Sequence, residues 1–86
     1  MAMSLAQAQA ELHNALRQME EVARMSAAIY AQAERIEQRL NAVKGSGIEP
    51  NKMPSTVALA AEFRRNAEGQ RHRAAALVQG IGAVIG

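Results

Sequence analysis

The feature that most constrains this sequence is a seven-residue repeat that runs from Leu5 to Lys44 without a glycine or a proline. With Leu5 at position a of the repeat, eleven of the twelve a and d positions are apolar, and the exception is Ser26. The a positions are Leu5, Leu12, Met19, Ser26, Ala33 and Leu40, and the d positions are Ala8, Ala15, Val22, Ile29, Ile36 and Val43. Apolar residues at this spacing line one side of an α-helix, so the repeat predicts a helix over about 5–44.

Both ends of this helix carry sequence signals. Ser4 and Gln7 have the spacing of a capping box, in which each side chain bonds the backbone amide of the other residue. At the other end, Gly45 fits the left-handed residue that closes a helix, and Lys44 lies near the last carbonyl groups, where a positive charge is favourable.

The apolar stripe is wider than a two-stranded coiled coil needs. Leu16, Ala23 and Tyr30 occupy e positions and extend the stripe to one side, which suits a helical bundle. On the opposite face, Glu20 and Arg24 are expected to form an i,i+4 ion pair.

Residues 45–54, GSGIEPNKMP, contain two glycines and two prolines and predict a turn. A second helix is predicted over about 55–83, with Ser55 as its N-cap after Pro54, and an earlier start capped by Asn51 is the alternative. The seven-residue repeat continues in this helix. One row holds Ala60, Ala67, Ala74 and Ile81, a second holds Phe63, Gln70, Leu77 and Val84, and Val57, Val78 and Ile85 widen the stripe.

The whole chain, 1–86, is therefore expected to form one all-α domain, an antiparallel two-helix hairpin. The shorter second helix should end before the first turns of the first helix, and Ser26, Gln70 and Arg73 should form a polar layer at mid-length. Each stripe is wider than one neighbour can cover, so we expect assembly with itself or a similar hairpin into a four-helix bundle or helical oligomer. The expected interface residues are Leu12, Leu16, Met19, Val22, Ile29, Tyr30, Ile36, Leu40, Phe63, Leu77, Ile81 and Val84.

Composition limits the other ways in which so small a fold could be stabilised or used. There is no cysteine and the two histidines, His13 and His72, do not make a zinc set, so no disulfide, metal, cofactor or small-molecule partner is expected. No serine or threonine has an adjacent His–acid pair, so no enzymatic activity is expected. The sequence has neither a signal-peptide pattern nor the ~18 apolar residues of a spanning helix. A cytoplasmic chain as synthesised is expected, with signal-less export left open.

An arginine-rich segment provides an alternative function. The net charge is only +2, but residues 55–86 carry four arginines against Glu62 and Glu68. Arginines on one helix face can contact the phosphates of a nucleic acid. Pairing of Glu68 with its arginine neighbours is the simpler interpretation. The candidate nucleic-acid contacts are Arg64, Arg65, Arg71 and Arg73.

The C-terminal run ALVQGIGAVIG provides a second alternative, contact with a membrane. Small residues at Ala76/Gly80 and Gly82/Gly86 have the spacing at which membrane helices pack closely. The run is too short to span a bilayer, so a helix-packing or assembly contact is the simpler interpretation. Gly69, Gly80 and Gly82 each cost roughly 1 kcal/mol relative to alanine, so the last turns are expected to fray unless a partner covers them.

The hairpin length, the absence of cysteine and of a signal peptide, and the glycine-bearing turn resemble the small WxG-motif proteins of type VII secretion. Those proteins are two-helix hairpins that pair into four-helix bundles, and the resemblance implies the same for this chain. The motif itself is absent, because the turn reads KGSGIEPNKMP and the chain has no tryptophan. Tyr30 and Glu34 have the spacing of that family's Tyr-x-x-x-acid export signal but fall within the first helix, so no function is transferred to them.

Type III secretion needle subunits are also short hairpins with a proline-bearing turn, and Pro50 and Pro54 are similar to that pattern. The first functional hypothesis is therefore a non-enzymatic helical interaction module that pairs through its heptad stripes, in secretion or in structural assembly. Nucleic-acid binding and membrane contact are the alternatives.

Overall fold

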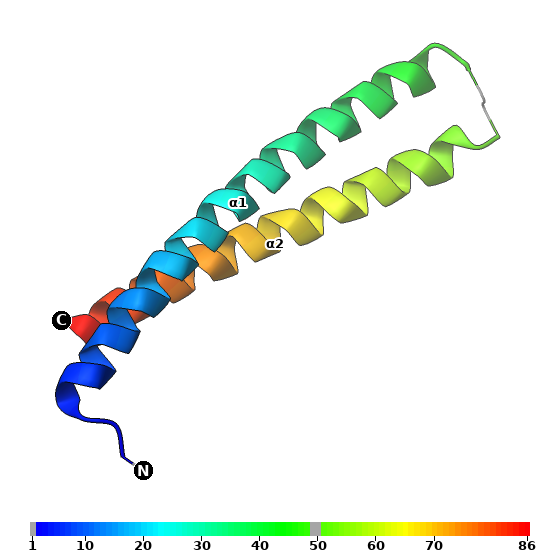
Figure 1. Ribbon diagram of the computed structural model, residues 1–86. Helices are drawn as coiled ribbons and strands as arrows, with labels where there is room; N and C mark the ends of the chain where they lie inside the picture. Colours follow the sequence, from blue (N-terminus) through cyan, green and yellow to red (C-terminus); the bar gives the residue numbers. More distant parts are fainter. Residues whose placement is uncertain (1, 49–50) are drawn as a thin grey trace.

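The computed structural model describes residues 2–48 and 51–86. Within these ranges the chain forms two α-helices, α1 (Leu5–Gly45) and α2 (Met53–Ile85), and no strand. The helices run antiparallel and side by side, so the molecule is long and thin, with extents of 63 × 21 × 14 Å (Figure 1). The predicted all-α antiparallel hairpin is confirmed.

The predicted cap at the start of α1 is present. The Gln7 amide donates to Ser4 Oγ over 3.1 Å, and the Ser4 amide donates to Gln7 Oε1 over 3.0 Å. Two of the free donors at the helix start are thereby satisfied. The first described turn of the fold is fixed by its own sequence rather than by tertiary packing.

α1 ends one residue later than predicted, and the left-handed glycine of the turn lies two residues later. Gly45 is the last helical residue, and Gly47 is the one with positive φ, at 81°. Ser46 at the C-cap explains the difference. Its amide and its hydroxyl both donate to the Val43 carbonyl, over 3.0 and 2.6 Å, and so extend the helical hydrogen bonding past Gly45.

The start of α2 was also predicted too late. The helix begins at Met53, and its N-cap is Lys52. Pro54 lies in the first turn, where backbone amides have no partner within the helix, so the amide hydrogen that proline lacks is not missed. The hydroxyls of Ser55 and Thr56 donate to the Lys52 carbonyl, each over 3.1 Å, so Ser55 is not the cap. The alternative cap, Asn51, lies one residue before the true one. Pro50, part of the predicted turn, lies outside the described residues.

The contact between the helices is made by small side chains. The buried residues are Ala33 in α1 and Met53, Ala67 and Ala74 in α2, and no side chain in the described ranges is both large and fully buried. Alanine rows allow two helices to approach closely, but each buried methyl contributes only about 0.8 kcal/mol. That is small against the roughly 1–2 kcal/mol of backbone entropy lost for each ordered residue.

The pairing of the two helices differs from the expected one at the open end of the hairpin. Val84 and Ile85 share a groove with Leu5 and Leu12, so α2 reaches the first turns of α1 instead of ending before them. The reason is the later end of α2, which continues to Ile85 instead of about residue 83.

The predicted polar layer at mid-length is only partly present. Ser26 and Gln70 line one groove between the helices, as expected. Arg73 is not part of it, because its guanidinium folds back along α2 and lies about 3.4 Å from the position that a Gly69 Cβ would take. The layer therefore consists of two neutral side chains.

The glycines of the hairpin provide a test of this description. A Cβ added at Gly80 or Gly82 meets no atom within 4 Å, so Gly80→Ala and Gly82→Ala should each raise the free energy of unfolding by roughly 1 kcal/mol. Gly47→Ala is the matched control, and it should destabilise the protein by about 1–2 kcal/mol because of the positive φ. Thermal unfolding followed by circular dichroism measures all three. A loss of stability in both helix variants would contradict the arrangement of α2.

Candidate interaction surface

The two sides of the helix–helix seam have opposite chemistry. The residues on one side are polar and contact one another, and we call them the polar flank. They are Tyr30, Glu34, Glu37, Arg64, Glu68 and Arg71. The other side carries large apolar side chains with no cover, and we call it the apolar face. Its members are Val22, Met25, Ile29, Ile36, Val43, Leu59, Phe63, Leu77 and Val84.

An ion pair joins the helices on the polar flank. Arg64 Nε donates to Glu37 Oε1 over 2.7 Å, and Arg64 Nη1 lies 3.5 Å from Glu68 Oε2 within α2. The side chains of Arg64 and Glu37 are only 25% and 18% exposed, so solvent screens this pair less than a surface pair. The hydrogen bond from Glu37 and its negative charge raise the pKa of Arg64 above its ordinary value.

A second contact across the seam is made by Arg71. Its guanidinium carbon lies 4.6 Å from the centre of the Tyr30 ring, which is the geometry of a cation–π interaction. Arg71 Nε is buried and has no hydrogen-bond partner among the described residues. A hydrogen bond with Glu34, together with burial, raises the pKa of the Tyr30 hydroxyl. The polar flank thus uses its charges mainly within the hairpin, where they favour this pairing of the helices.

The apolar face is the largest feature that the hairpin leaves unused. Its nine side chains are between 38% and 68% exposed. They come from both helices, because Val22, Ile29 and Ile36 follow the d row of α1 and Phe63, Leu77 and Val84 follow the facing row of α2. Isolated exposed apolar residues are ordinary, but nine along one side of so small a hairpin make this side a candidate interaction site.

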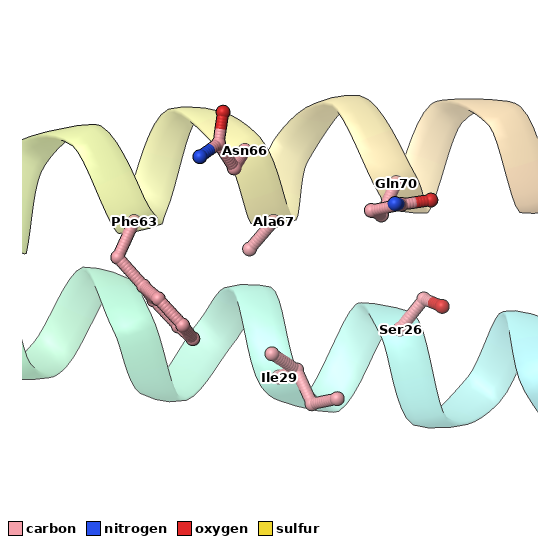
Figure 2. Close-up of a pocket in the computed structure, with 6 residues that line it drawn as sticks. All are labelled: Ser26, Ile29, Phe63, Asn66, Ala67 and Gln70. Atoms are coloured by element: carbon pink, nitrogen blue, oxygen red, sulfur yellow. The ribbon is translucent and has the colours of Figure 1, made fainter.

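Phe63 is the centre of the apolar face, because three grooves meet at it. Figure 2 shows its ring extending from α2 toward α1, with Ile29 on α1 and Gln70 above Ser26 further along. The groove in Figure 2 has a volume of about 260 Å³. A second, of about 310 Å³, lies toward α1 and is lined by Ala28, Ile29, Gln32, Ala33, Ile36 and Phe63. A third, of about 340 Å³, lies toward the turn and includes Leu59 and Leu40.

The structure divides the twelve predicted interface residues into two equal groups. Val22, Ile29, Ile36, Phe63, Leu77 and Val84 are exposed on the apolar face. Leu12, Leu16, Met19, Tyr30, Leu40 and Ile81 are half-buried. The prediction omitted three members of the face: Val43, although it is a d position of the repeat, and Met25 and Leu59. Met25 and Leu59 lie four residues before Ile29 and Phe63. That spacing places them on the same helix face, and it was the signal available in the sequence.

The four candidate nucleic-acid arginines are not brought together on one surface. Arg64 and Arg71 contact residues of the polar flank. Arg65 and Arg73 are exposed, and Arg73 lies along its own helix over Gly69. Of the predicted intrahelical pairs, Glu68 pairs with Arg64 as expected, but its other neighbour is His72 at 3.9 Å rather than Arg71. In α1, Arg24 bonds Glu21 instead of Glu20.

The remaining candidates from the sequence are a metal site, a membrane helix and the small-residue spacing near residue 80. No three potential metal-ligating side chains converge within residues 2–48 and 51–86. Neither α1 nor α2, as far as the structure describes them, is long and apolar enough to cross a membrane. Gly80 and Gly82 have open space beside them, so the hairpin does not itself use the small-residue spacing of its C-terminal run.

Comparison with known proteins adds no relative. No protein family, curated protein or solved structure matches this chain. The resemblance to small secretion hairpins therefore stays a prediction, and the function has to be argued from the surface itself.

The polar flank can be tested with a double-mutant cycle. Arg64→Gln and Glu37→Gln should each lower the unfolding midpoint, and the double variant should lose little more than either single one, because both remove the same contact. Added salt should narrow the difference from the unmodified protein. Arg65→Gln is the matched control and should leave the midpoint unchanged. Fully additive losses would show that the two side chains do not interact.

Proposed function

We propose that this protein is a non-enzymatic helical assembly module that docks its apolar face onto another helical hairpin, either a second copy or a similar chain. The observation that carries the proposal is the contrast between the small buried side chains and the large exposed ones. The buried residues include three alanines, whereas nine large apolar side chains are left on one exposed face. Burial of apolar surface is the main favourable contribution to folding. A chain with this distribution therefore obtains most of its hydrophobic stabilisation by association.

The exposed area supports the same proposal. The hairpin exposes 6356 Å², whereas a compact monomer of 9.2 kDa exposes about 4,900 Å². The excess on one chain is larger than the ~800 Å² that each partner buries in a standard protein–protein interface. A chain of this size usually needs a disulfide, a metal or a partner chain, and the sequence contains no cysteine.

The resemblance to the small type VII secretion hairpins also supports assembly as the activity, since those hairpins pair into four-helix bundles. Secretion as the process served rests on that resemblance alone. Assembly through the apolar face rests on the exposed side chains and does not depend on it.

A charge placed at the centre of the apolar face provides the test. Phe63→Glu should shift the protein from an assembled to a monomeric mass in light scattering across a concentration series, because two buried carboxylates would face the interface. Gln79→Glu adds the same charge to an outward position of α2 and should leave the assembled mass unchanged. A monomeric mass for the unmodified protein at every concentration, alone and with candidate partner hairpins, would overturn the proposal.

A further inference from the structure

The distribution of exposed apolar residues separates a closed pair from an open polymer. Apart from Met3, Leu5 and Ile48 near the ends of the helices, every exposed large apolar side chain that the structure describes belongs to the apolar face. A filament needs two different complementary surfaces on each copy, whereas a two-fold dimer needs one surface that is complementary to itself. Among the described residues, the apolar face is the one large apolar surface.

The apolar face meets the electrostatic condition for pairing with an identical copy. None of its nine members carries a charge, and the polar residues that line the two grooves beside Phe63, which are Ser26, Gln32, Asn66 and Gln70, are neutral. Charged residues, Arg39 and Arg73, come in only at the border, four residues before Val43 and Leu77. Like charges facing each other across an interface cost several kcal/mol. The centre of this face around Phe63 can meet its own copy without that cost, while the charged residues of the polar flank point to the opposite side.

Phe63 and an open apolar groove lie side by side at the same level of the hairpin. The Phe63 ring is 57% exposed and borders the groove of about 310 Å³ lined by Ile29, Gln32 and Ile36 of α1. An enclosed apolar cavity of about 150 Å³ is enough to hold benzene. A two-fold axis parallel to the helices places α2 of one copy over α1 of the other without a shift along the axis. Each Phe63 ring then enters the groove of the other copy.

The same two-fold rotation places the polar layer of one copy against the polar layer of the other. Ser26 and Gln70 lie at the same level of the hairpin, on α1 and α2 respectively (Figure 2). With α2 of one copy over α1 of the other, the Gln70 amide of each copy lies over the Ser26 hydroxyl of its partner. Buried amides and hydroxyls need hydrogen-bond partners. A slip along the axis would leave them against apolar side chains, so the layer favours one register.

From these four observations we infer that the occupant of the apolar face is a second copy of this chain, in a closed four-helix dimer with both turns at the same end. Phe63 of each copy fills the groove of the other. This inference rests on the proposed function, which it makes specific. The face is at most 63 Å long and 21 Å wide, which is ample for the ~800 Å² that each partner buries in a standard interface.

Cysteine cross-linking tests the arrangement, since the chain has no cysteine of its own. The Ser26→Cys variant mixed with the Gln70→Cys variant should form a disulfide-linked dimer under mild oxidation, because each chain then presents one thiol to the other. Each variant alone should cross-link at least tenfold less. Gln38→Cys mixed with Gln79→Cys, both at outward exposed positions, is the control and should give no linked dimer.

The outcomes separate this inference from the proposed function. A Ser26→Cys variant that links efficiently to itself would place α1 against α1 and overturn the same-end dimer, although assembly through the apolar face would stand. A dimeric mass without the mixed cross-link would do the same. A monomeric mass at all concentrations would overturn both.

Discussion

The alanine rows at the helix–helix contact are the constraint on which the rest of the structure depends. Ala33 on α1 and Ala67 and Ala74 on α2 bring the backbones close enough for side chains on both flanks to meet across the seam. On one flank this contact joins Arg64 to Glu37 and Arg71 to Tyr30. On the other flank the large side chains have no room between the helices and remain outside. The same close approach therefore produces an ion-paired flank and an unsatisfied apolar face.

These two flanks have different consequences for assembly. The polar flank satisfies most of its charges within the hairpin and offers a partner little that is not already used. Burial of the apolar face would add hydrophobic stabilisation that the hairpin alone does not have. Its neutral Ser26–Gln70 layer can fix the register between two hairpins at a modest cost in stability. In the proposed assembly, the interactions that form the hairpin are thus separate from the surface that would contact another hairpin.

The sequence was sufficient to predict the helices but not which face of each helix contacts the other. A repeat free of glycine and proline over 5–44 predicts a long helix because the local signal is strong, and the Ser4–Gln7 capping box marks its start. The ends at Gly45 and Ser55 were misplaced because of local hydrogen bonds that residue types alone do not reveal. The Ser46 hydroxyl donates to the Val43 carbonyl, and the Ser55 hydroxyl donates to the Lys52 carbonyl instead of capping the helix. The a, d and e positions appeared as one broad stripe. Which part of it faces the partner helix is decided by Arg64 and Arg71, which lie opposite Glu37 and Tyr30 only in the folded hairpin.

The concentration dependence of thermal unfolding tests the central claim most directly, since a hairpin with an alanine core should owe its stability to association. Binding to the folded state raises stability by mass action, so a hundredfold increase in protein concentration should raise the unfolding midpoint by roughly 5–10 °C. The helical signal and the assembled mass should be lost together. A midpoint that stays constant over that range, with cooperative unfolding of a monomer, would contradict the account.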